Sequence, residues 1–159
     1  MDIIEDLVKH AVTTSYDSLP QQTIEATKMG ILETLGTLIA GATAPGCNTI
    51  INLVKEWGGK EESTILAHGG KVPVHNAAMV NSVMARALDF DDGTAWGLHL
   101  SASTVPTALA MTERCGGVNG REFITAIALG KDIAGRLTKA TTYRGFDPSG
   151  VSMAFGTTV

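Results

Sequence analysis

The chain has 159 residues, of which 44% are hydrophobic and 18% charged, and its formal net charge is −4. This composition is typical of one globular domain with a substantial core, and it excludes an intrinsically disordered chain. An acidic chain without a basic stripe is poorly suited to phosphates, so we expect no nucleic-acid partner.

The first residues, MDIIEDLVKHAV, have neither the basic start nor the long apolar run of a secretory signal peptide. The longest apolar-rich stretch, MGILETLGTLIAGATA, is broken by a glutamate, threonines and glycines, which indicates a core helix and no membrane span. Cys47 and Cys115 match no metal-ligand spacing, and we expect both to be reduced thiols. These features predict a cytoplasmic protein without a membrane partner.

Helical periodicity runs through most of the chain, because apolar residues recur every three to four positions. The expected helices cover about 3–14, 20–41, 49–57, 75–88, 103–115 and 121–141. Asp2 is expected to cap the first helix and Pro20 to start the second. Apolar residues cover more than half the circumference of the second helix, which predicts that it is buried between neighbours.

The stretch STILAHGGKVPV (63–74) gives the only β signal, two short apolar runs around a glycine pair that predict a small hairpin. The last residues, DPSGVSMAFGTTV, begin another apolar helix at Pro148 and Ser149, so we expect the natural polypeptide to continue past Val159. The predicted fold is all-α, a single partial helical domain over 1–159 with at most one short β-hairpin.

The stretch ALDFDDGTAWGLHLSAS (87–103) combines three acids, Asp89, Asp91 and Asp92, with His99 ten residues after the first of them. Acids in such a place often only cap a helix or serve a solvated loop, and a lone histidine is more often structural. The functional alternative is a proton-transfer pair, because a carboxylate can orient an imidazole. We expect a poorly solvated Asp89 to share a cleft with His99, while Asp91 or Asp92 serves mainly in the loop.

Two motifs of metal or phosphate chemistry fail in this stretch. An EF-hand loop counted from Asp89 would need an oxygen ligand at Gly93 and an acid at Leu100. A phosphatase-type DxDGT motif would need an aspartate in place of Phe90, and a strand before it, where the spacing is helical. We therefore expect no metal ligands here.

From about 74 to 137 the sequence resembles the MmgE/PrpD family, which includes 2-methylcitrate dehydratase, cis-aconitate decarboxylase and iminodisuccinate epimerase. The resemblance is carried by HNAAMVNSVMARALDFDD, then GLHLSAST, then ALAMTERCGGVNGREFITAIALGKDIAGRL. It implies a helical domain followed by a smaller α+β lid domain, with the active site between them and no cofactor. The lid domain and the family's catalytic lysine would lie beyond Val159, so this chain lacks both.

Residue by residue, the resemblance implies catalytic roles for Asp89, the first acid of DFDD, and for His99. Thr94 lies next to the position of a family threonine. Ser101 matches the serine of a family His-Pro-Ser segment, in which Leu100 replaces the proline here. Thr94 and Ser101 are expected to donate hydrogen bonds to a substrate carboxylate. Asp147 stands where the family has a histidine, in a segment that would also contact substrate, and an acid there disfavours a tricarboxylate.

The resemblance implies an enzyme that abstracts a proton next to a carboxylate of a small substrate, with elimination as the outcome. Two alternatives remain open: an epimerase that uses the same proton abstraction, and a catalytically inactive helical module that needs a separate C-terminal chain. An incomplete helical domain should also expose apolar faces, which predicts a homodimer or a higher homo-oligomer.

Overall fold

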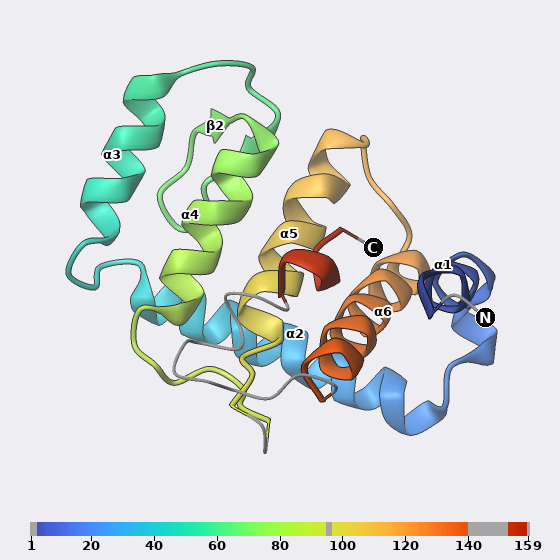
Figure 1. Cartoon of the computed structure of the whole chain (residues 1–159). Coiled ribbons are helices and arrows are strands. Elements are labelled where there is room, and N and C mark those ends of the chain that lie inside the picture. The colour runs from blue at the N-terminus through green and yellow to red at the C-terminus, as the bar shows by residue number, and fades with distance from the viewer. Residues whose placement is uncertain (1–2, 95–96, 140–152, 159) are drawn as a thin grey trace.

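The computed structural model describes residues 3–94, 97–139 and 153–158, which are mainly helical (Figure 1). Its elements are α1 (Ile3–Thr13), the 3₁₀ helix η1 (Tyr16–Ser18), α2 (Gln21–Gly41), α3 (Cys47–Trp57), β1 (Ser63–Thr64), β2 (Lys71–Val72), α4 (Val74–Arg86), α5 (Ser101–Arg114) and α6 (Gly120–Lys139). The predicted all-α fold with one short hairpin is confirmed. The expected caps Asp2, Pro148 and Ser149 lie outside the described residues, and a helical turn lies at 153–156.

The hairpin lies where the sequence predicts it, and side chains fasten it to two helices. Its antiparallel strands pair Ser63 with Val72 and Thr64 with Lys71. The buried Asn81 of α4 donates from Nδ2 to the Thr64 carbonyl at 3.0 Å, and its Oδ1 accepts from the Leu66 amide at 2.9 Å. Ser63 Oγ donates to the Ala110 carbonyl of α5 at 2.7 Å, so the hairpin is bonded to both helices and does not form a sheet domain of its own.

The core lies between α4, α5 and α2, and α4 packs most extensively against the other two (Figure 1). Val80 and Met84 of α4, Val105 of α5 and Leu38 of α2 are fully buried. A Cβ added at Gly41 would lie 2.1 Å from the carbonyl oxygen of Met84, so the end of α2 approaches the α4 backbone very closely. This packing fixes the position of the end of α4, where the acidic stretch begins.

The prediction that α2 is buried between neighbours is correct for only one of its faces. Its buried face consists mostly of small or hydroxyl-bearing residues, together with two apolar ones: Ile24, Thr27, Gly30, Thr34, Thr37, Leu38 and Gly41. The larger side chains Met29, Leu32 and Ile39 are each about two-thirds exposed. Small residues let α2 lie close to its neighbours, and the apolar residues on the opposite face account for the misleading periodicity.

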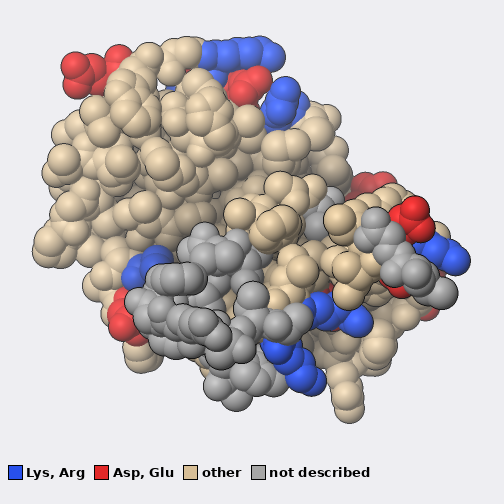
Figure 2. Space-filling view, in the orientation of Figure 1, with Lys and Arg blue, Asp and Glu red and all other residues tan. Residues whose placement is uncertain are grey.

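The surface over α3 and α4 is largely uncharged, with Lys, Arg, Asp and Glu gathered along its rim (Figure 2). Among the helices that the structure describes, none combines the length and the apolar character needed to cross a membrane.

Candidate active site

The stretch between α4 and α5 turns sharply at both ends. Asp89 adopts a left-handed backbone conformation (φ 52°), which aspartate tolerates better than most residues, and its amide donates to the Arg86 carbonyl at 3.0 Å. Farther on, the Thr94 amide donates to the Leu98 carbonyl at 2.9 Å, and Thr94 Oγ1 accepts from the Leu98 amide at 3.1 Å. These turns fold the acids back toward His99.

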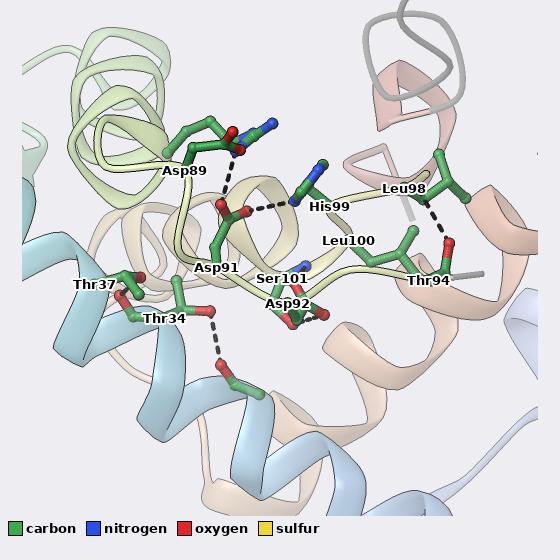
Figure 3. Close-up of polar contacts among 12 residues, drawn as sticks. Thr34, Thr37, Asp89, Asp91, Asp92, Thr94, Leu98, His99, Leu100 and Ser101 are labelled. Carbon is green, nitrogen blue, oxygen red and sulfur yellow. Dashed lines mark hydrogen bonds and ion pairs between the residues drawn. The ribbon is translucent and has the colours of Figure 1, made fainter. Parts of the chain in front are cut away.

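Asp91 is the acid that contacts His99. Its side chain is 1% exposed, and its Oδ2 lies 3.2 Å from Nδ1 of His99 (Figure 3). Its other oxygen, Oδ1, accepts a hydrogen bond from Nη1 of Arg86 at 2.9 Å. The two atoms are within ion-pair distance but are not aligned as a hydrogen bond. The negative charge of Asp91 next to Nδ1 favours a proton on that nitrogen, and this arrangement suits a group that transfers protons.

The expectation of a poorly solvated Asp89 is wrong, and of the two acids expected to serve mainly in the loop, Asp91 instead contacts His99. The Asp89 side chain is 78% exposed and pairs with Arg86. The chain turns outward at Asp89 because of its left-handed conformation, and Asp91 is the residue that enters the interior. Asp89 still lies on the same side as His99, since one ligand atom from each of Asp89, Asp91 and His99 lies within 4.8 Å of the others.

Arg86 balances the charges of the acids. Its hydrogen bond to Asp89, and then its positive charge, lower the pKa of Asp89. Partial burial opposes the charged form of Arg86, but the hydrogen bond to Asp89 and the charge of Asp91 raise the pKa of the guanidinium. Arg86 and Asp89 therefore form a charged pair beside the imidazole at neutral pH.

Asp89, Asp91 and His99 are also close enough together to act as ligands of a single metal ion. However, the Arg86 guanidinium donates to both carboxylates. A cation held at that position repels a second cation and competes for the carboxylate oxygens. The arrangement therefore favours acid–base chemistry over metal binding.

A second polar cluster joins Asp92, Ser101 and Lys131. The Ser101 amide and hydroxyl donate to the two oxygens of Asp92, at 3.0 and 2.7 Å (Figure 3). Lys131 of α6 donates to Ser101 Oγ at 2.7 Å. Sequence reasoning missed Lys131, because it lies 39 residues after Asp92 and no local pattern joins the two.

The residues expected to bind substrate differ in their exposure and in their hydrogen bonds. Ser101 is 1% exposed and its hydroxyl is hydrogen-bonded to Asp92, so binding a substrate would require that bond to break. Thr94 is partly exposed and lies in the turn that precedes His99. Asp147 lies outside the described residues.

A hollow of about 720 Å³ lies elsewhere, between α4, α5, α6 and residues 156–158. Its described lining is mainly apolar and includes His75, Cys115 and Glu122 but none of the residues around His99. The proton-transfer geometry and the hollow are therefore separate features of the described part of the chain.

Comparison with known proteins finds one family model that matches nearly the whole chain. The model of the MmgE/PrpD N-terminal domain matches residues 5–159. Cis-aconitate decarboxylase of Homo sapiens is 28% identical to the chain over 123 residues. The match covers 75% of this chain and 26% of the decarboxylase, so the chain spans about a quarter of the length of that relative.

Proposed function

Because the chain belongs to the MmgE/PrpD family, we propose that it serves an enzyme that abstracts a proton next to a carboxylate of a small substrate. One observation carries this proposal: Nδ1 of His99 lies 3.2 Å from a carboxylate oxygen of Asp91, whose side chain is 1% exposed. The Asp91 carboxylate stabilises a protonated imidazole, so Nε2 of His99 is the nitrogen that exchanges a proton with the substrate.

In the proposed elimination, Nε2 of His99 takes the proton from the carbon next to the substrate carboxylate. The electron pair of that C–H bond forms a carbon–carbon double bond, and a hydroxyl group on the neighbouring carbon leaves. The protonated imidazole returns its proton to the departing hydroxyl, which leaves as water, so His99 ends as it began. The Asp91 carboxylate stays beside Nδ1 of the ring throughout, and Arg86 holds Asp91 by a hydrogen bond.

Exposed Asp89 fits a substrate-orienting role better than a role as partner of the imidazole. A substrate carboxylate also needs a cationic partner. Arg86 and Lys131 are already paired with Asp89, Asp91 and Asp92. We infer that this cation comes from another segment or another chain, which is consistent with the family's placement of its catalytic lysine.

Two alternatives use the same residues differently. An epimerase would return the proton to the opposite face of the same carbon, and no group would leave. A catalytically inactive helical module would need a separate C-terminal chain for activity. Deuterium from the solvent separates these alternatives. An epimerase incorporates it into the substrate carbon, and an inactive module incorporates none.

The test follows small di- and tricarboxylates, including cis-aconitate, in deuterated water by NMR. Measurements use this chain alone and together with the product of any adjacent reading frame. We expect deuterium to enter the carbon next to a carboxylate, and His99→Gln to slow this roughly a hundredfold or more. The matched control is His75→Gln, since His75 is exposed and lies in the first turn of α4, whereas the acidic stretch follows the other end of that helix.

The outcomes separate the candidates. Deuterated substrate with inverted configuration indicates an epimerase, and an unsaturated product indicates a lyase. Equal exchange rates in wild type and His99→Gln would refute the role of His99. If neither preparation gives exchange or an unsaturated product, the enzyme proposal is contradicted and the helical module is left.

A further inference from the structure

The cluster of Asp92, Ser101 and Lys131 joins three segments at the start of α5. Asp92 lies in the acidic stretch, Ser101 is the first residue of α5, and Lys131 belongs to α6. Both oxygens of Asp92 accept from Ser101, at 3.0 and 2.7 Å, and Lys131 Nζ lies 3.3 Å from Oδ2 of Asp92. Each member contacts the other two, since Lys131 also donates to Ser101 Oγ at 2.7 Å.

A fourth segment makes room for this cluster. Gly30 of α2 faces it, and a Cβ at Gly30 would lie 2.8 Å from Ser101 Oγ and 3.0 Å from Lys131 Nζ. Any larger residue would push these polar atoms aside. The absence of a side chain at Gly30 thus leaves the space in which the Lys131 ammonium lies against Ser101 Oγ.

Burial makes the three members depend on one another. Ser101 is 1% exposed, and the side chains of Asp92 and Lys131 are 22% and 21% exposed. Charges with so little solvent need a partner, and the loss of one leaves the other poorly solvated. Without Lys131, the Asp92 carboxylate would keep only its contacts with Ser101 and would add an unbalanced charge next to Asp91.

The cluster lies next to the proton-transfer pair in the chain. Asp92 follows Asp91 directly, and Ser101 comes two residues after His99. The hydrogen bonds between Asp92 and Ser101 close the loop whose two ends carry Asp91 and His99. The 3.2 Å contact between Asp91 and His99 therefore depends on that closure.

We propose that Lys131 is a positioning residue for His99, acting through Asp92 and Ser101 to hold the imidazole against Asp91. This role rests on the proposed function of His99, but it can be measured without turnover. A carboxylate oxygen 3.2 Å from Nδ1 favours, through its charge, the tautomer that carries the proton on Nδ1. A loosened imidazole exchanges between its two tautomers.

The experiment records two-dimensional proton–nitrogen NMR spectra of the imidazole rings at a pH where they are neutral. His99→Gln identifies the His99 signals by their loss. In wild type we expect separate shifts for Nδ1 and Nε2 that mark a single tautomer. In Lys131→Met we expect the two shifts to move toward a common average, while the circular dichroism spectrum stays helical. Lys28→Met is the matched control, because Lys28 forms only an exposed pair with Glu25.

Unchanged His99 shifts in a folded Lys131→Met variant would overturn the proposal and leave Lys131 as a structural contact. If that variant does not fold, Lys131→Gln provides the same comparison, since it keeps a donor but removes the charge. Failure of both variants to fold would also count against a positioning role, because the contact would then be needed for folding itself.

Where the carboxylate screen detects activity, Lys131→Met should lower kcat about tenfold and change KM little, since the lysine acts on the base and does not touch substrate. A change in KM alone would contradict this expectation. If neither the chain alone nor its mixture with an adjacent-frame product is active but the NMR result is as expected, the proposed function is refuted and the positioning of His99 is kept.

Discussion

At the scale of single residues, the three aspartates of the acidic stretch look alike in sequence but differ in exposure and in their partners. Asp89 is exposed and pairs with Arg86, Asp91 is buried against His99, and Asp92 is bonded to Ser101 at the start of α5. A carboxylate with little solvent and a fixed imidazole beside it stabilises the protonated ring during proton transfer. An exposed carboxylate can do so only weakly.

We therefore predict a difference between Asp91→Asn and Asp89→Asn in whichever assembly is active. Asp91→Asn should lower kcat roughly a hundredfold, because an amide can neither fix the tautomer nor stabilise the imidazolium. Asp89→Asn should act mainly on KM, since asparagine keeps the left-handed backbone and only the charge facing the substrate is lost. Steady-state kinetics of both variants measure this difference, and equal losses of kcat would contradict it.

The sequence predicted which stretch and which histidine form the candidate site, because the spacing of DFDD and His99 is local information. It did not predict which acid contacts the imidazole. That depends on the left-handed turn at Asp89, and aspartate adopts such turns only in some contexts. The contact of Lys131 with Asp92 could not be predicted from the sequence either, because α6 and the acidic stretch come together only when the helices pack.

At the scale of elements, the prediction of helices succeeded where apolar periodicity and helix ends agreed. The hairpin was also correct, because Gly69 and Gly70 both adopt positive φ angles, as its turn requires. The burial of α2 was predicted only in part. The size of the side chains, and not only their polarity, determines which face of α2 packs against its neighbours. The hydroxyl of Thr34 donates a hydrogen bond to the Gly30 carbonyl at 2.7 Å, so this polar side chain can lie on a buried face.

Two glycines of α2 give a matched test of this packing. A Cβ at Gly41 would lie 2.1 Å from the Met84 carbonyl oxygen, whereas one at Gly36 would meet nothing within 4 Å. We predict that Gly41→Ala lowers the free energy of unfolding by about 2 kcal/mol or more, because α2 and α4 must separate. Gly36→Ala should raise it by about 0.5–1 kcal/mol through helix propensity.

Denaturant unfolding followed by circular dichroism measures both variants under the same conditions. A Gly41→Ala variant as stable as wild type would show that α2 and α4 can move apart without loss. The close approach at Gly41 would then have no role in placing the end of α4 and the acidic stretch that follows it.

At the scale of the whole molecule, the described surface carries an apolar face that the fold does not use. Met29, Leu32 and Ile39 are spaced by three and seven residues, so they share one face of α2, and each is about two-thirds exposed. The α1 helix has no buried residue and exposes further large apolar side chains: Ile3, Ile4, Val8 and Val12. An exposed apolar face on a helix is typical of an interface.

We predict that the chain self-associates through this face of α2. In sedimentation velocity at tens of micromolar, wild type should be a dimer or larger, because burying Met29 and Leu32 between copies removes apolar surface from water. The double variant Met29→Glu/Leu32→Glu should shift the chain to monomer without loss of helical circular dichroism, since both positions face solvent in the isolated chain. Leu53→Glu of α3, a less exposed apolar position on another helix, should remain associated. A wild-type monomer throughout this range would contradict self-association, and an associated double variant would place the interface elsewhere.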